Sequence, residues 1–169
     1  MKKMQFMEIF SGCYESSPWV AERAFAARPF ASAVELQSIF RTIVDQADPS
    51  QQDALIRAHP DLGGRLARAG RLTPESTREQ SRLGLDQLDA AAFQTFAKLN
   101  RTYLDRFHFP FIICVGLLRH HSQIQDALVA RLDNSPQAER QEGLRQIHLI
   151  AGLRLTALVE GLPPVPEQD

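Results

Sequence analysis

Apolar residues recur three or four positions apart along most of the chain, with polar residues between them. This is the spacing of one buried face of an α-helix. It is clearest before residue 48 and after residue 143, where its members are Leu36, Phe40, Ile43, Ala47, Leu144, Ile147, Ala151, Leu155 and Leu158. The aromatic residues Phe93, Phe96, Tyr103 and Phe107 follow the same spacing. The pattern predicts an all-α fold of seven or eight short to medium helices around one core.

Capping residues and prolines predict where these helices begin and end. A serine or threonine followed by proline places a capping hydroxyl before a proline that suits the first helical turn. Three helix starts of this kind lie at Ser17-Pro18, Thr73-Pro74 and Ser135-Pro136. Ser32 and Glu35 form a capping box, so a helix is expected from there to about Pro49. A short helix over residues 50–58 then ends at His59, because a proline disfavours the helical conformation of the residue before it.

One run, Phe109 to Val115, has the β-branched and aromatic character of a buried strand. No partner strand is evident elsewhere, and an isolated strand would leave its backbone groups unpaired. We therefore expect a short extended or helix-entry segment whose N–H and C=O groups can bind a polar ligand. A helix is expected to follow, with one side formed by Leu117, His121, Ile124, Leu128 and Leu132.

Length and charge limit the class of protein. The chain has 169 residues, of which 44% are hydrophobic and 23% charged, and its formal net charge is −1. This length suits one domain, which we expect to cover residues 1–169 with an irregular, proline-rich tail from about residue 162. A near-neutral chain without a basic block argues against nucleic acid as a partner.

The remaining composition favours a cytoplasmic protein without a membrane partner. Cys13 and Cys114 are too few and too far apart for a disulfide framework. The apolar run over residues 109–118 is too short to span a bilayer. No signal-peptide core follows the basic residues at positions 2 and 3, and the last three residues are not a peroxisomal address.

Acid, base and hydrogen-bonding side chains are densest between residues 57 and 80. His59 stands at a helix end before Pro60, where its ring can face a cavity. Ser76 lies three residues before Glu79 and four before Gln80, so the three share a face of the helix predicted from Thr73. A histidine, a carboxylate, a hydroxyl and an amide can therefore converge on one pocket. Singly, each is also typical of a helix-end hydrogen bond or a solvated helix face, and both interpretations stay open.

Arg154 lies on the flank of the last apolar stripe, seven residues after Ile147 and four before Leu158. A buried arginine keeps its charge and needs an anion or a set of acceptors. A structural carboxylate, surface water or an anionic ligand would each satisfy it. His120 and His121 are adjacent and point to different faces, and the motif H-E-x-x-H is absent, which argues against a metal site and a metallohydrolase.

Six blocks of sequence, in this order, carry a family resemblance: SPWVAERA (17–24), AHPDLGG (58–64), LTPESTREQ (72–80), NRTY (100–103), RFHFPFIIC (106–114) and IAGLRL (150–155). The ordered set resembles the 2-oxo-4-hydroxy-4-carboxy-5-ureidoimidazoline (OHCU) decarboxylases of the uric acid pathway. The blocks span most of the chain at about the spacing of that family.

The resemblance implies a carboxy-lyase that converts OHCU to (S)-allantoin, the last step from urate to allantoin in purine catabolism, without a metal or organic cofactor. It also implies that the protein forms a homodimer and that the molecule it binds is this small substrate. Carried onto the matching residues, it implies a general acid/base at His59, a carboxylate at Glu79 that holds a substrate hydroxyl or ring N–H, and an oxygen-binding cation at Arg154. The implied substrate-binding residues are Pro60, Ser76, Gln80, Phe111, Ile112, Ile113, Cys114 and Val115.

The sequence departs from the family at one point. Where the family commonly has C-V-K/R-G, Cys114-Val115 is followed here by Gly116, and Arg119 is the next basic residue. This puts a ligand contact from that basic side chain in doubt, but not the backbone contacts. The alternative function is a non-catalytic helical binding module that has kept the pocket, and the joint presence of His59, Glu79 and Arg154 argues against it.

Overall fold

Seven α-helices and one 3-10 helix make up the part of the chain that the computed structural model describes, residues 1–62 and 90–161. In chain order they are α1 (Lys3–Phe10), α2 (Pro18–Phe25), α3 (Ala33–Asp45), α4 (Pro49–Ala58), α7 (Ala90–Phe107), η2 (Val115–Leu117), α8 (Ser122–Arg131) and α9 (Pro136–Glu160). Within these residues there is no strand, and the predicted all-α class is confirmed.

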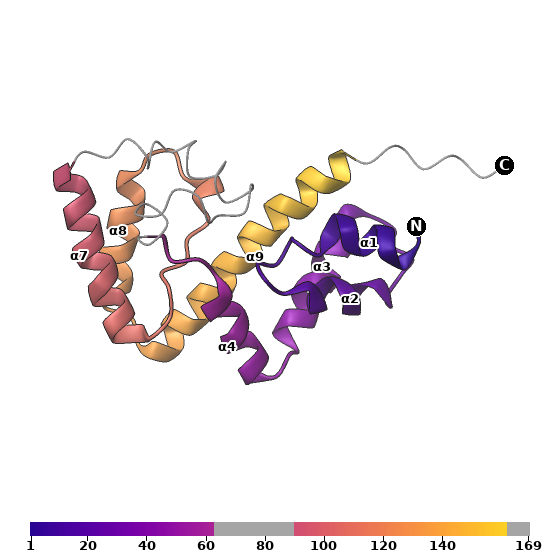
Figure 1. Ribbon diagram of the computed structural model, residues 1–169, viewed down its shortest axis with the longest axis horizontal. Coiled ribbons are helices and arrows are strands. Elements are labelled where there is room, and N and C mark those ends of the chain that lie inside the picture. The colour runs from indigo at the N-terminus through magenta and orange to yellow at the C-terminus, as the bar shows by residue number, and fades with distance from the viewer. Residues whose placement is uncertain (63–89, 162–169) are drawn as a thin grey trace.

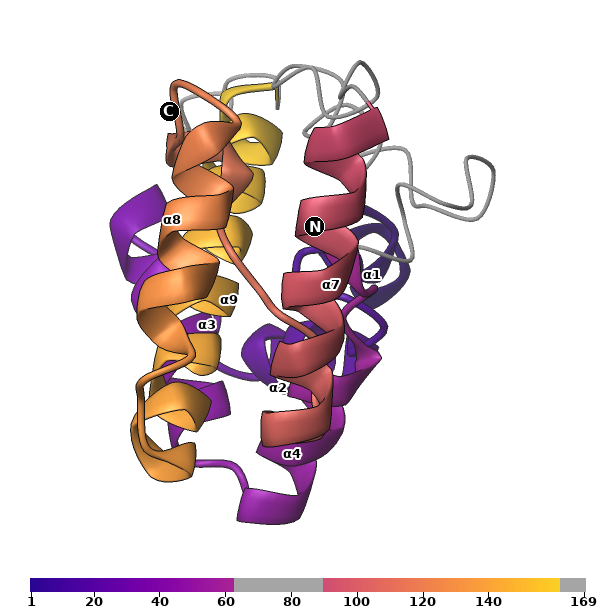
Figure 2. The same ribbon diagram turned by 90° about the vertical axis from the view of Figure 1, so that its left-hand side faces the viewer.

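Helix α9 is the element around which the others are arranged (Figure 1). Its 25 residues extend for about 37 Å at the usual rise per residue. Helices α1, α2 and α3 lie towards its C-terminal end, α7 and α8 lie towards its N-terminal end, and α4 lies between the two groups (Figure 1). The second view shows α7 and α8 side by side (Figure 2).

The apolar residues form two clusters rather than the one core expected from sequence. The first cluster joins α1, α2, α3, α4 and α9, and its fully buried members include Val20, Phe40 and Val44. The second lies between α7 and α8 and includes Tyr103 and Leu128, neither of which has any exposed surface. The two clusters meet at the segment that connects α7 to η2.

That connecting segment is extended, as predicted. Phe111 and Val115 belong to the second cluster, whereas Ile112 and Cys114 belong to the first. Ile113 packs against the second cluster. Side chains that alternate between two sides are the property of an extended backbone. The segment therefore passes between the two clusters and enters η2 directly.

Local signals predicted most helix boundaries. The Ser32 hydroxyl accepts a hydrogen bond from the Glu35 N–H at 3.1 Å at the start of α3. The Ser135 hydroxyl accepts one from the Ala138 N–H at 3.2 Å at the start of α9. Ser17 precedes α2 as expected, but its hydroxyl makes no capping bond. The helix expected from Thr73 lies outside the described residues.

Helix α8 begins later than predicted. Leu117 lies in η2 with 55% of its surface exposed, so its predicted place on one side of the next helix, with Ile124 and Leu128, is wrong. The chain makes a turn first, and α8 starts at Ser122. The physical reason is Gln123, whose Oε1 accepts hydrogen bonds from the Arg119 N–H (2.8 Å) and the His120 N–H (3.0 Å), which satisfies the amides of this turn.

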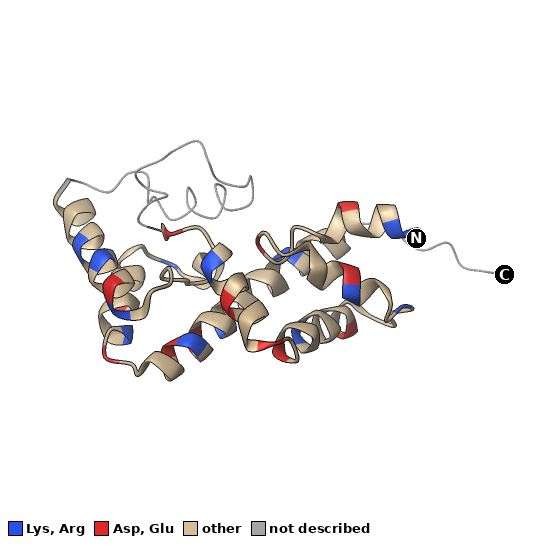
Figure 3. Cartoon of the chain, turned by 60° about the horizontal axis from the view of Figure 1, so that its bottom comes forward, with Lys and Arg blue, Asp and Glu red and all other residues tan. Residues whose placement is uncertain are grey.

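The described helices have no membrane-crossing pattern, and their charged residues are not all of one sign. None of them combines the length and the apolar character needed to cross a bilayer. Acidic and basic residues are interspersed over the helices (Figure 3). This distribution matches the formal net charge of −1.

Candidate active site

His59 marks the point where α4 stops. Its backbone leaves the helical region, with φ −64° and ψ 132°, because Pro60 follows it. The side chain is buried, with 6% of the residue exposed. Its Nδ1 lies 3.3 Å from the carbonyl oxygen of Leu55. A carbonyl can only accept, so this contact favours the ring tautomer that carries hydrogen on Nδ1.

Three segments that are far apart in sequence meet in one pocket at His59. The end of α4, the extended segment before η2 and helix α9 each contribute side chains. The lining residues are His59, Pro60, Leu62, Phe111, Ile112, Ile113, Val115, Ile150 and Arg154. Seven of them are residues that the sequence singled out, and Leu62 and Ile150 are apolar additions. The structure thus brings the predicted histidine, the predicted arginine and the predicted backbone wall to one place.

Four predicted site residues are not among those that line the described pocket. Cys114 does not line this pocket, because its side chain is buried in the first apolar cluster and its N–H is bonded to Gln146. Ser76, Glu79 and Gln80 lie outside the described residues, so their proposed roles remain predictions.

Arg154 forms an ion pair with Glu15, a residue that the sequence did not single out. Its Nη1 lies 3.0 Å from Oε2 of Glu15 and 3.3 Å from the carbonyl oxygen of Gly12. Both partners of the ion pair are buried, with side chains 8% and 5% exposed. Arg154 therefore pairs with a structural carboxylate, which was one of the alternatives that the sequence left open, and it also lines the pocket.

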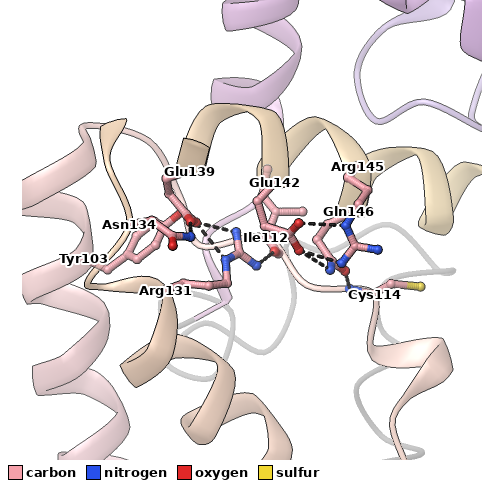
Figure 4. A network of polar contacts seen from close by, with 9 residues as sticks. All are labelled: Tyr103, Ile112, Cys114, Arg131, Asn134, Glu139, Glu142, Arg145 and Gln146. Atoms are coloured by element: carbon pink, nitrogen blue, oxygen red, sulfur yellow. Dashed lines mark hydrogen bonds and ion pairs between the residues drawn. The ribbon is translucent and has the colours of Figure 1, made fainter. Parts of the chain in front are cut away.

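A buried polar network holds the extended segment on its other side (Figure 4). Arg131 of α8 donates from Nη1 to the Ile112 carbonyl at 2.7 Å and from Nε to Glu139 at 2.8 Å. Glu139, which is fully buried, also accepts hydrogen bonds from Tyr103 and Asn134. Burial, and then the bond to Glu139, raise the pKa of the Tyr103 hydroxyl, which stays a neutral donor.

A second part of the network binds Cys114. Gln146 of α9 accepts the Cys114 N–H at 2.8 Å, and its own amide donates to Glu142 at 2.7 Å. Arg131 also lies over the ring of Phe111, with its guanidinium carbon 4.6 Å from the ring centre. The backbone and one aromatic side chain of the pocket wall are therefore fixed by residues that do not line the pocket themselves.

A larger hollow of about 480 Å³ lies between α3 and α9, and none of the predicted site residues that the structure describes lines it. His148 stands in its wall, where its Nδ1 lies 2.8 Å from the Tyr14 hydroxyl oxygen and its Nε2 lies 3.0 Å from Oδ1 of Asp45. Burial lowers the pKa of His148 in spite of the opposing effect of Asp45. Of the predicted acid, base and charged side chains, the two that the structure describes, His59 and Arg154, therefore both line the smaller pocket.

Comparison with known proteins decides the family. A sequence model described as OHCU decarboxylase matches residues 1–156. The chain belongs to the OHCU decarboxylase family. A 2-oxo-4-hydroxy-4-carboxy-5-ureidoimidazoline decarboxylase from Halalkalicoccus jeotgali is 42% identical over 156 residues, which are 92% of this chain and 86% of that protein.

Solved structures of similar proteins have the same fold. An OHCU decarboxylase crystallised in the presence of (S)-allantoin matches with a TM-score of 0.72 and 26% identity, over 95% of this chain and 99% of the other. A structure of (S)-allantoin synthase matches with a TM-score of 0.71 and 27% identity, and this chain spans about half (51%) of that longer protein.

Gly116 stands where the OHCU decarboxylase pattern commonly has a basic residue. A Cβ atom at this position would lie 2.5 Å from Cδ1 of Leu153, so a larger residue here would require the end of that exposed side chain to shift. Arg119 does not replace it, because Arg119 is exposed and does not line the pocket.

Proposed function

We propose that this chain decarboxylates OHCU to (S)-allantoin, the last step from urate to allantoin, without a metal or organic cofactor. The observation that carries the proposal is the meeting of His59, Arg154 and the backbone wall in one pocket of a chain of this family. A proton carrier, a fixed cation and oriented backbone groups are the parts that this reaction requires.

The substrate sets these requirements. OHCU is a small anionic ring that carries a carboxylate, a hydroxyl and a ureido arm. When carbon dioxide leaves, the electron pair of the broken bond is delocalised into the ring, so the ring itself serves as the electron acceptor. Protonation of one face of the ring then gives one enantiomer of allantoin. The protein must therefore place charge correctly and deliver a proton from one side.

His59 is the proposed general acid/base. Histidine is the side chain that ordinarily exchanges protons near neutral pH, and the contact with Leu55 fixes the ring so that Nε2 is the nitrogen that exchanges a proton with the substrate. Burial in the pocket keeps bulk water from competing for that proton. General acid–base catalysis contributes roughly 10²–10⁴-fold to a rate, which is the loss expected when the ring is removed.

Arg154 is the proposed anchor for an anionic or carbonyl oxygen of the substrate. Its pairing with Glu15 restricts the guanidinium to one orientation before the substrate arrives, so less freedom is lost on binding. Glu79 is proposed to hold or polarise the substrate hydroxyl or a ring N–H, and Ser76 and Gln80 are proposed to bind the ring and the ureido arm. Pro60 and the segment from Phe111 to Val115 provide the remaining wall.

The experiment that tests this function generates OHCU in situ from urate with the two upstream enzymes and follows allantoin by circular dichroism, with and without a chelator. The proposal predicts rapid appearance of one enantiomer, at the same rate in the chelator. If the protein did not accelerate product formation over the slow uncatalysed background, the decarboxylase assignment would fail and a binding module would replace it.

We also propose that residues 1–169 form a single domain, that the chain acts in the cytoplasm and that it assembles as a homodimer. The contacts of α9 with α1, α3 and α4 support the first of these. Light scattering tests the dimer, and a monomeric mass at assay concentration would contradict it.

A further inference from the structure

The two peptide groups on either side of Ile113 are each held by a buried side chain (Figure 4). Arg131 Nη1 donates to the Ile112 carbonyl at 2.7 Å, and Gln146 Oε1 accepts the Cys114 N–H at 2.8 Å. The Ile112 carbonyl belongs to the same peptide group as the Ile113 N–H. In the same way, the Cys114 N–H belongs to the same peptide group as the Ile113 carbonyl.

These two contacts also determine the directions in which the N–H and the C=O of Ile113 point. Both peptide bonds are trans, and in a planar trans peptide the N–H and the C=O point in opposite directions. The Ile113 N–H therefore points away from Arg131, and the Ile113 carbonyl points away from Gln146. Within the described residues, neither of these backbone groups has a hydrogen-bond partner, and Ile113 lines the pocket together with His59 and Arg154.

We propose that Gln146 is a positioning residue for the decarboxylation: by accepting the Cys114 N–H, it aims the Ile113 carbonyl at a substrate N–H in the pocket. The proposal rests on the proposed function, because that function supplies the substrate. The ureido arm and the ring of OHCU both carry N–H groups that such a carbonyl can accept. Gln146 does not line the pocket, so its effect passes through the peptide group that it holds.

The orientation of Gln146 is itself fixed. A glutamine amide can turn over and present its NH₂ group instead of its oxygen, which would repel the Cys114 N–H. Here the NH₂ group donates to Glu142 Oε1 at 2.7 Å, and Glu142 is held by two bonds of 2.7 Å from Arg145. Hydrogen bonding to Arg145 lowers the pKa of Glu142, which keeps this carboxylate an acceptor at neutral pH. The oxygen of Gln146 therefore faces Cys114.

Gln146 offers a cleaner test than Arg131, because Arg131 is part of a buried ion pair on which stability also depends. The test variant is Gln146→Leu, which keeps the size of the side chain and removes the acceptor. Its matched control is Gln37→Leu, since Gln37 of α3 also binds α9 through polar contacts but bonds to Gly152 and Thr156, away from the wall. Both variants lose a half-buried or buried amide, and only one of them loses the contact with Cys114.

Steady-state kinetics of the in situ assay, run at a temperature at which circular dichroism shows both variants folded, distinguish positioning from a structural role. We expect kcat/KM of Gln146→Leu to fall about 10- to 100-fold with a raised KM, because small misplacements of a binding group have effects of this size. Gln37→Leu should keep the wild-type KM. A structural defect alone would lower the amount of active protein and leave KM unchanged, and that result would overturn the proposal.

A reciprocal swap provides the rescue. In Glu142→Gln/Gln146→Glu, one carboxylate oxygen at position 146 can accept the Cys114 N–H while the other accepts the amide of the new glutamine. Recovery of most of the lost kcat/KM would support the proposal, and a swap as defective as Gln146→Leu would contradict it. An inactive wild type would defeat the proposed function, whereas an active wild type with a fully active Gln146→Leu would defeat only the positioning role.

Discussion

Replacing Glu139 by glutamine should destabilise the protein strongly, although the change alters one atom and leaves the shape of the side chain intact. Glu139 has no exposed surface, and its carboxylate accepts hydrogen bonds from Tyr103, from Arg131 Nε at 2.8 Å and from Asn134 at 2.7 Å. A glutamine would remove the carboxylate that pairs directly with the buried Arg131, and its NH₂ group would face other donors. The variant therefore removes one partner of a buried ion pair.

The size of the effect follows from that burial. Removal of one partner from a buried ion pair costs about 3–5 kcal/mol. Domains are typically stable by about 5–15 kcal/mol in total, so the loss is a large part of the whole. For a domain of this length, 1 kcal/mol corresponds to about 2–4 °C in Tm, which predicts a decrease of roughly 6–20 °C. Urea unfolding followed by far-UV circular dichroism measures the free energy directly.

The matched control is Glu142→Gln, three residues further along α9. Glu142 pairs with Arg145, whose side chain is 56% exposed, and such pairs contribute about 0–1 kcal/mol. We expect this control to unfold close to the wild type. If Glu139→Gln also stayed within about 1 kcal/mol of the wild type, the network would not act as a buried ion pair, and the structural basis of the pocket wall would need another explanation.

Two further predictions concern other buried charges. Glu15→Ala should lower the free energy of unfolding by about 3–5 kcal/mol, because it removes one partner of the buried ion pair between Glu15 and Arg154, and an unchanged urea midpoint would contradict this. The lowered pKa of His148 means that the unfolded chain takes up a proton first as the pH falls below about 6.5, so stability should decline from there towards lower pH. His148→Gln should make this decline shallower in urea midpoints measured between about pH 7 and 5, and equal slopes for the two proteins would refute the assignment.

Features that depend on neighbouring residues could be predicted from the sequence. The bond from Ser32 to Glu35 and the turn from His59 into Pro60 each involve residues a few positions apart, so the local pattern contains all the information needed. The run from Phe111 to Val115 has no partner strand in the sequence, which favoured an extended or helix-entry segment, and in the structure Val115 begins η2. These signals left the roles of His59 and Arg154 open, and the resemblance to the OHCU decarboxylases is what indicated them and the wall as site residues.

Features that depend on distant partners could not be predicted in this way. Glu15 and Arg154 are 139 residues apart, and Gln146 meets Cys114 across 32 residues. One signal was nevertheless present: Glu139, Gln146 and Arg154 occupy the buried positions of α9 at helical spacing, interrupting an apolar stripe. Polar residues at such positions require buried partners, although the sequence does not say which ones.

The most direct test of the central claim compares wild type, His59→Ala and the exposed-histidine control His120→Ala in the in situ OHCU assay, with allantoin chirality followed by circular dichroism. The account predicts rapid formation of one enantiomer by the wild type and the control, and a rate lower by roughly 10²–10⁴-fold for His59→Ala with its helical spectrum unchanged. Full activity of His59→Ala would remove this histidine from the mechanism and contradict the account of the pocket.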